Sequence, residues 1–393
     1  MAPAARTAGT RLRPAERRRQ LVDVATALFL EQGYGKVSVS DIARAAGISG
    51  PSVYRHFPDK EAILAAAMRS AVDEMAETTA RVLARPGATF DDLSSGVFAM
   101  AVSRPGPLAL WRWNRRHLTA EQAREMIAAS ESVLSSWTEV LRRDHPELTD
   151  DDARVLTWAV LAVGGSVPPS RGRIGIRRYR DDLEVIAQRV LRAAPSTAPE
   201  LPAPPARRAP VVRSDEILDA ASELFFSRGY SAVSMDDIGA AVGISGPSVY
   251  GHFPSKGSIL VGIVARARAA LEIGVVGAAA ESDGDPLAEL RSLVRSYAAN
   301  LVSSTDLAVA FTVGREVVIE SGGEALLAAQ KAYVARWVAL LAAGSDEVDA
   351  PGARIAVGAA MTIANDFART RRLRGRPRFH DELVHLVDAA LGV

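Results

Sequence analysis

Asp41–Lys60 reads DIARAAGISGPSVYRHFPDK, and this stretch decides the fold. Its first residues favour a short helix that stops at Gly47, after a start resembling a capping box. Gly50–Phe57 favours a further helix with Pro51 in its first turn, where a missing backbone N–H breaks no hydrogen bond. Two helices joined by a short glycine-containing turn are typical of the helix-turn-helix motif, whose second helix enters the major groove of DNA.

The second of these helices is expected to have two different faces. Val53 and Phe57, spaced i and i+4, would face the core. The outward positions are polar or aromatic, and none of them is acidic: Ser52, Tyr54, Arg55 and His56. Such a face favours contact with the phosphates and base edges of DNA.

The same stretch occurs twice. Phe29–Lys60 reappears as Phe225–Lys256 at a constant offset of 196 residues, and 20 of the 32 positions are identical. Fainter similarity continues at an offset of 200, where Trp137 corresponds to Trp337. The sequence therefore predicts that a whole module is duplicated, and not only its first part.

Apolar residues outside the motif recur at helical spacing, and no run alternates as a strand would. We therefore expect an all-α chain of two tandem modules, each with a helix-turn-helix followed by five or six further helices. The expected divisions are a basic disordered arm (1–15), a first helix-turn-helix (16–60), a first helical domain (61–192), a Pro/Ala-rich linker (193–212), a second helix-turn-helix (213–256) and a second helical domain (257–393).

The composition is that of a globular protein, with 48% hydrophobic residues, 24% charged residues and a net charge of +1. The absence of cysteine excludes disulfides, thiolate zinc sites and cysteine nucleophiles. No purely apolar run reaches the roughly 18 residues of a membrane span, and no secretory signal is recognisable. We expect a cytoplasmic protein that is not an enzyme and that binds no metal or cofactor.

The motif AGISGPSVYRHFPDK resembles the signature of the tetracycline-repressor (TetR) family of bacterial transcription regulators, and both copies match it. The resemblance implies a sequence-specific regulator that binds a double-stranded DNA operator. By family default it would be a repressor released by a small apolar or amphipathic effector. In the remaining helices the resemblance extends only to size and helicity.

Carried over position by position, the resemblance assigns DNA contacts to matching residues of the two copies. Tyr54, His56 and Lys60 match phosphate-contacting positions, whereas Gly50, Pro51 and Ser52 match positions that face base edges. The counterparts in the second copy are Gly246, Pro247, Ser248, Tyr250, His252 and Lys256. Arg44 and Arg55 add basic groups to the first copy alone.

In this family the later helices hold the effector and pair two subunits through a four-helix bundle. Here the fused copies could pair within one chain as a pseudo-dimer, with 150–165 and 177–191 against 346–365 and 378–391; a further homodimer stays open. The candidate pocket residues are Trp111, Trp113, Arg115, Met126, Trp137 and Trp158 in the first copy, and Phe311, Arg315, Trp337 and Met361 in the second. Large aromatic residues on helices belong to the core more often than to a pocket wall, and the commoner role of each arginine is a plain salt bridge or a solvated position.

The two copies differ in charge. Residues 11–62 carry 9 basic and 6 acidic side chains, whereas residues 207–258 carry 5 and 6. Because phosphate neutralisation supplies most non-specific affinity for DNA, we expect the N-terminal copy to be the dominant reader. Two alternatives stay open: a regulator whose second copy is only a sensor and dimerisation half, and a helical enzyme, although no cluster of acids, bases and nucleophiles supports the latter. The basic arm could contact DNA or remain a solvated tail.

Overall fold

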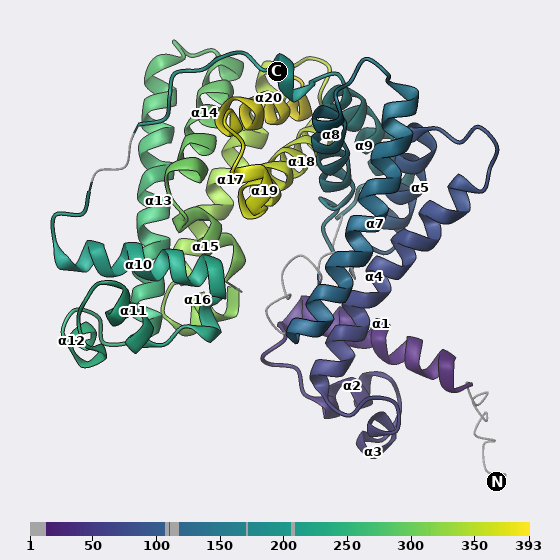
Figure 1. Ribbon diagram of the computed structural model, residues 1–393, viewed down its shortest axis with the longest axis horizontal. Coiled ribbons are helices and arrows are strands. Elements are labelled where there is room, and N and C mark those ends of the chain that lie inside the picture. The colour runs from purple at the N-terminus through teal and green to yellow at the C-terminus, as the bar shows by residue number, and fades with distance from the viewer. Residues whose placement is uncertain (1–12, 107–109, 111–117, 170–171, 206–208, 314) are drawn as a thin grey trace, which may run out of the picture. The chain divides into compact units, whose positions relative to one another are not determined.

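The computed structural model describes residues 13–106, 110, 118–169, 172–205, 209–313 and 315–393 (Figure 1). Every regular element in these residues is an α-helix or a 3-10 helix, and none is a strand. The predicted all-α class is therefore confirmed. The chain divides into two compact units. The first unit comprises residues 1–74 with 106–127, and the second comprises residues 75–105 with 128–393. This division differs from the repeat, because most of the first copy's later helices belong to the second unit.

The first unit contains the first helix-turn-helix. Its helices are α1 (Pro14–Gln32), α2 (Val39–Ala45), α3 (Gly50–Tyr54) and the beginning of α4 (Lys60–Leu83). The core is built from apolar residues of all four helices and the following turn, among them Leu21, Phe29, Ile42, Val53, Phe57, Ile63 and Met68. The expected inward orientation of Val53 and Phe57 is thus confirmed. Most of the predicted arm lies outside the described residues, and Pro14 already belongs to α1.

The second unit holds later helices of the first copy and all of the second copy. From the first copy it has α5 (Phe90–Ser103), most of α7 (Ala120–Asp144), α8 (Asp150–Gly164) and α9 (Ile176–Leu191). The second copy supplies η3 (Tyr230–Ala232), α10 (Arg213–Arg228), α11 (Met235–Ala241), α12 (Gly246–Tyr250), α13 (Lys256–Glu281), α14 (Pro286–Ser303), α15 (Asp306–Thr312), α16 (Arg315–Glu320), α17 (Glu324–Gly344), α18 (Ala350–Arg369), α19 (Arg371–Arg374) and α20 (Phe379–Leu391). More helices follow its motif than the five or six expected, because α15, α16 and α19 are short segments.

Helices from both copies pack together within the second unit. Helices α8 and α9 of the first copy contact α18 and α20 of the second (Figure 1). These four helices bury apolar side chains, including Leu156 and Val160 of α8, Leu183 and Ile186 of α9, Ile363 of α18 and Leu386 of α20. Each fully buried Leu, Ile or Val contributes about 1.5–3 kcal/mol relative to an exposed one, so apolar burial is the main stabilising contribution here.

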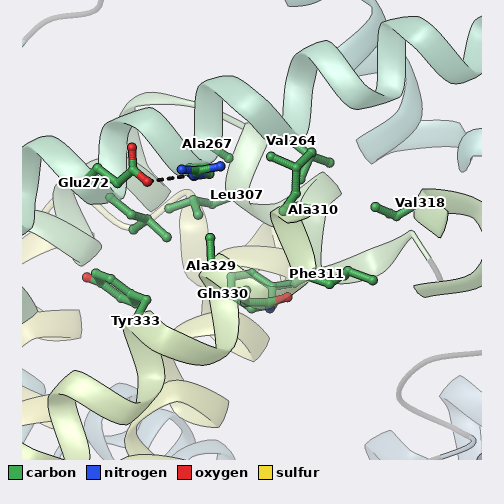
Figure 2. A pocket seen from close by; sticks show the side chains of 14 residues that line it. Val264, Ala267, Glu272, Leu307, Ala310, Phe311, Val318, Ala329, Gln330 and Tyr333 are labelled. Atoms are coloured by element: carbon green, nitrogen blue, oxygen red, sulfur yellow. Dashed lines mark hydrogen bonds and ion pairs between the residues drawn. The ribbon is translucent and has the colours of Figure 1, made fainter. Parts of the chain in front are cut away.

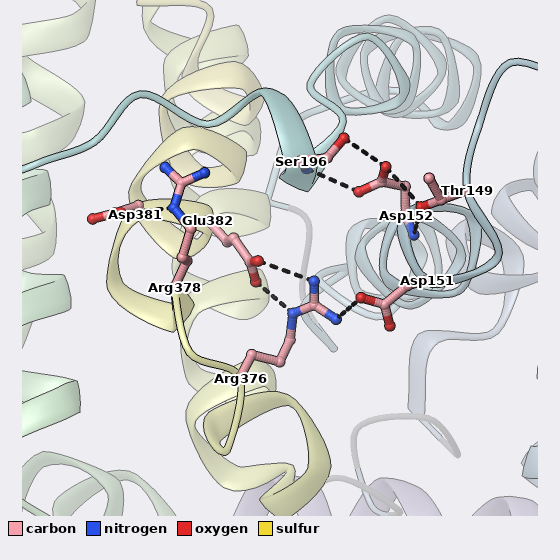
Figure 3. A network of polar contacts seen from close by, with 8 residues as sticks. All are labelled: Thr149, Asp151, Asp152, Ser196, Arg376, Arg378, Asp381 and Glu382. Atoms are coloured by element: carbon pink, nitrogen blue, oxygen red, sulfur yellow. Dashed lines mark hydrogen bonds and ion pairs between the residues drawn. The ribbon is translucent and has the colours of Figure 1, made fainter.

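A polar network borders this four-helix contact (Figure 3). The guanidinium of Arg376, between α19 and α20, donates to Asp151 of α8 and to both carboxylate oxygens of Glu382 in α20. The linker also takes part: at its 3-10 turn η2 (Pro195–Thr197), the Ser196 N–H donates to Asp152 over 2.9 Å, and its hydroxyl donates over 2.6 Å. The start of the predicted linker is therefore held against α8 and is not free along its whole length.

One helix in the described ranges, α17, is long and apolar enough to cross a membrane by length and composition. Lys331 and Arg336 interrupt its sequence, and 17% of its most apolar window is buried. The helix packs against α13, α14 and α18 through Tyr333, Trp337 and Leu341. Its buried side chains therefore belong to the core of the second unit.

Asp388 of α20 is half-buried, and its Oδ1 has no hydrogen-bond partner among the described residues. Burial raises the pKa of this carboxyl from 3.8 to about 7, against the opposing charges of Arg295 and Arg291. The folded state therefore holds the Asp388 proton more tightly than the unfolded state, so the contribution of this group to stability is fully present below pH 4 and is lost as the pH rises through 7. We expect roughly 2 kcal/mol less unfolding free energy from this group at pH 7 than at pH 5.

Urea unfolding of the wild type and of Asp388→Asn between pH 5 and pH 8 measures this effect. The amide does not titrate, so the variant should show a flatter dependence of unfolding free energy on pH. Equal slopes for the two proteins would show that Asp388 ionises normally.

Candidate DNA-binding interface

Each helix-turn-helix begins with a reciprocal cap, as the sequence predicts. In the first copy, the Asp41 N–H donates to Ser38 Oγ over 3.1 Å, and the Ser38 N–H donates to Asp41 Oδ2 over 3.0 Å. Ser234 and Asp237 repeat both bonds in the second copy at 3.1 and 2.8 Å. The hydrogen bonds from these serines lower the pKa of both aspartates, which stay charged at the positive end of the helix.

The turn between the two motif helices depends on one glycine. Gly47 has φ +68° and Gly243 has φ +71°, in the left-handed region where a side chain would be strained. The next N–H then bonds back into the preceding helix: Ile48 donates to the Ala43 carbonyl, and Ile244 to the Gly239 carbonyl, both over 2.9 Å. The two copies therefore present their second helices through the same local geometry.

The recognition helices are shorter than predicted. Helix α3 ends at Tyr54 and not at Phe57, and Arg55 is its C-terminal cap. The N–H groups of His56 and Phe57 both donate to the Val53 carbonyl in a closing turn. The cause is Pro58, which disfavours helical backbone in the residue before it. Arg55 and His56 thus follow the end of α3, as Gly251 and His252 follow the end of α12.

Tyr54 and Tyr250 are the large exposed side chains of these helices, with 58% and 55% of their surface exposed. Pro51 and Pro247 are also exposed, whereas the Ser52 hydroxyl pairs with that of Ser49 over 2.8 Å. Exposed aromatic groups at a helix end are available to a partner surface. This arrangement supports the predicted contact role of the two tyrosines without testing it.

The two predicted phosphate lysines make internal bonds. Lys60 Nζ donates to the Tyr34 carbonyl over 2.9 Å and lies 4.2 Å from the centre of that ring. Lys256 Nζ donates to the Tyr230 and Val233 carbonyls over 2.9 and 2.8 Å, and burial lowers its pKa. Each lysine therefore stabilises the turn that precedes the first helix of its helix-turn-helix. A phosphate contact would have to share the ammonium with these carbonyls or replace them.

Sequence reasoning missed the role of Arg18. This arginine of α1 donates to the His56 carbonyl over 2.5 Å, and its guanidinium lies 4.0 Å from the centre of the Phe57 ring. It therefore fixes the end of the recognition helix. The run Arg17–Arg19 is visible in the sequence, where it is counted only among the basic side chains of residues 11–62. Arg44 remains 77% exposed although it pairs with Asp41.

The second copy contains a cavity with about 550 Å³ of empty space, part of which is open to solvent (Figure 2). Its lining is mostly apolar and comes from α13, α15, α16 and α17: Val264, Ala267, Leu271, Leu307, Ala310, Phe311, Val318, Leu326, Leu327 and Ala329, with the polar Gln330 and Tyr333. Arg268 and Glu272 also line it and form an ion pair of 2.6 Å. A mostly apolar lining with a few polar groups is typical of a small-molecule site.

The candidate pocket residues fall in different places. Phe311 lines the cavity, whereas Trp337 is fully buried next to Tyr297 and Tyr333, and Met361 is buried in α18. In the first copy, Met126 belongs to the core of the first unit and Trp158 is half-buried on α8. Trp137 is fully buried, and its indole N–H donates to Thr79 over 2.9 Å. Trp111, Trp113 and Arg115, and the side chain of Arg315, lie outside the described residues.

Among the described residues, no group of three or more His, Asp or Glu side chains could hold a metal ion. Two segments, residues 21–67 and 217–263, match the family model "Bacterial regulatory proteins, tetR family". Both segments contain the complete helix-turn-helix described above. The chain thus contains two copies of this tetR-family domain.

Curated relatives match mainly around this domain. The transcriptional repressor KstR2 of Rhodococcus jostii is 30% identical over 27% of this chain and 53% of its own length. The transcriptional regulator BetI of Agrobacterium fabrum is 28% identical over 38% of this chain and 74% of its own. The chain thus spans about half the length of KstR2. A solved TetR/AcrR-family regulator from Thermobifida fusca is 27% identical over 44% of this chain and 96% of that chain, with a TM-score of 0.35.

Proposed function

We propose that the chain is a sequence-specific DNA-binding transcriptional regulator, and that it acts as a repressor released by a small effector. One observation carries the proposal: a capped helix-turn-helix presents Pro51, Tyr54 and Arg55 at the exposed end of a short helix. The TetR domain matched on both copies is the family context for this geometry. Repression and release by ligand are the default of the family.

The N-terminal copy is the dominant reader in this proposal. Its basic residues Lys36, Arg44 and Arg55 correspond to Ala232, Ala240 and Gly251 in the second copy. Fewer phosphates are then neutralised, so fewer counterions are released on binding and the affinity falls. The alternative is that the second copy is purely a sensor and dimerisation half. It too would follow from the smaller number of basic residues in the second copy.

The cavity of the second copy is our proposed effector site. Its lining favours an apolar or amphipathic molecule whose polar end meets Gln330, Tyr333 or the Arg268–Glu272 pair. Helix α15 contributes Leu307, Ala310 and Phe311 to the wall.

The same helix contacts α10 of the second helix-turn-helix. Arg266 of α13 pairs with Asp219 of α10 and with Asp306 of α15, over 2.6 and 2.9 Å. The Ser222 and Thr305 hydroxyls form a further bond of 2.9 Å between α10 and the residue before α15. A ligand that displaces α15 would therefore act directly on α10, and through the contact of α15 with α18 it would also act on α8 and α9 of the first copy.

Filling the cavity should abolish ligand binding. In Ala310→Trp the indole would occupy space between α13, α15 and α17, so affinity for the apolar anionic dye 8-anilinonaphthalene-1-sulfonate should fall at least tenfold, measured by fluorescence titration. Ala332→Trp is the matched control, because Ala332 is exposed on α17 and does not line the cavity. Equal dye binding by both variants would argue against this site.

The four-helix contact between α8, α9, α18 and α20 supports our proposal of an intrachain pseudo-dimer. In such an arrangement, fusion replaces association of two chains with an intramolecular contact at high effective concentration. The two copies can then differ in sequence without losing their pairing.

Fluorescence anisotropy with labelled duplexes tests the proposed function. Fragments from upstream of the protein's own gene are compared with a random duplex of equal length from 50 to 200 mM salt. We expect specific binding whose affinity falls with salt, because basic groups contact phosphates. Failure to bind any duplex at low ionic strength would refute DNA-binding regulation.

A further inference from the structure

The second recognition helix differs from the first at its start. In the second copy, Asp236 stands where the first copy has Ser40. A Cβ built on Gly246 would lie 1.7 Å from Oδ1 of Asp236, so this carboxylate covers the glycine, and Gly246 is buried. At Gly50, which is half-buried, no described atom beyond its chain neighbours and its own helix backbone comes within 4 Å of the equivalent position.

The position of the carboxylate follows from the local fold. Asp236 is in the first turn of α11, whose start is fixed by the reciprocal bonds between Ser234 and Asp237. The tight turn at Gly243 then brings the start of α12 back against that first turn. Asp236 itself remains exposed, so its charge faces solvent beside Gly246.

We propose that the Asp236 carboxylate keeps the second helix-turn-helix from binding DNA, so that the chain reads its operator through the first copy. This inference rests on the proposed function. A fixed negative charge at the start of the recognition helix would meet DNA where base edges and phosphates approach, and like charges brought together at an interface oppose binding. The carboxylate also occupies the space above Gly246 that close approach of a base edge requires.

The second motif has fewer basic groups than the first to offset this charge. The positions of Lys36, Arg44 and Arg55 are alanine or glycine, and residues 207–258 have one more acidic than basic side chain. A carboxylate can also accept a hydrogen bond from the amino group of cytosine. That contact needs surrounding basic groups to hold the phosphates close, and the second copy has lost three of them.

The test uses the full chain with its first reader disabled by Tyr54→Ala and Arg55→Ala. In this background, Asp236→Ser is expected to raise affinity for duplex DNA at least tenfold at low salt and to steepen its salt dependence. The matched control is Glu347→Ser in the turn between α17 and α18, which removes the same charge from an exposed position outside the motif. The control should change affinity less than twofold.

The reciprocal variant tests the first copy. In the otherwise unmodified chain, Ser40→Asp should lower affinity at least tenfold while the melting temperature stays within a few degrees of the wild type. No gain from Asp236→Ser, or an equal gain from Glu347→Ser, would overturn the inference. A loss on Asp236→Ser would also overturn it, because the carboxylate would then contact a base. Absence of DNA binding by the wild type would instead refute the proposed function.

Discussion

Replacing both Tyr54 and Arg55 by alanine is expected to weaken binding of the full chain to its operator by roughly 100-fold or more. Both side chains project from the end of α3, and Tyr54 is 58% exposed. A contact to a phosphate or a base edge contributes about 1–3 kcal/mol, so the loss of two contacts corresponds to about two to four powers of ten. Anisotropy titrations at 100 mM salt measure the change.

The second copy supplies the control for this prediction. Tyr250 is 55% exposed at the equivalent position, so Tyr250→Ala is the same truncation in the same local fold. We expect it to change affinity less than threefold, because Gly251 and Asp236 leave this surface without basic support. Far-ultraviolet circular dichroism should show equal helix content in all variants. A loss from Tyr250→Ala as large as that from the first-copy variant would contradict the dominance of the N-terminal reader.

The helix-turn-helix could be predicted because its determinants are local. Ser38 and Asp41 cap one another across three residues, and Gly47 supplies the left-handed turn that no neighbouring side chain could adopt without strain. Helix α3 is shorter than the sequence predicts, because Pro58 disfavours helical backbone in the residue before it. The internal bonds of Lys60 to the Tyr34 carbonyl depend on chain segments 26 residues apart, which local pattern does not reveal.

The predicted pocket shows a different limit of sequence reasoning. Phe311 and Trp337 both occupy helical positions of the same apolar type, yet one lines the cavity and the other is fully buried behind it. Whether such a residue lines the cavity or belongs to the core depends on how α14, α17 and α18 pack, which the sequence does not show. The sequence shows that Asp236 replaces Ser40. The effect of this replacement on the recognition helix depends on how close the carboxylate lies to Gly246, which the sequence does not show.

Removing Arg376 is expected to cost about 3–5 kcal/mol of unfolding free energy, because its partner Glu382 is only 7% exposed. Arg376 joins Asp151 of the first copy to Glu382 of the second, and the hydrogen bond with Glu382 is the main reason that the pKa of the guanidinium is raised. In Arg376→Met the carboxylate would remain buried without a countercharge, which costs more than the loss of a surface ion pair. Urea unfolding at pH 7 measures the difference.

A double-mutant cycle separates the cost of an unpaired charge from the contribution of the pair itself. Arg376→Met with Glu382→Leu removes both buried charges and should recover most of the stability, since apolar side chains often replace a buried ion pair without loss. Asp151→Asn is the comparison, because Asp151 is 64% exposed and a surface pair contributes at most about 1 kcal/mol. If Arg376→Met were no more destabilising than Asp151→Asn, Glu382 would have to be solvated, and the network would not hold the two copies together.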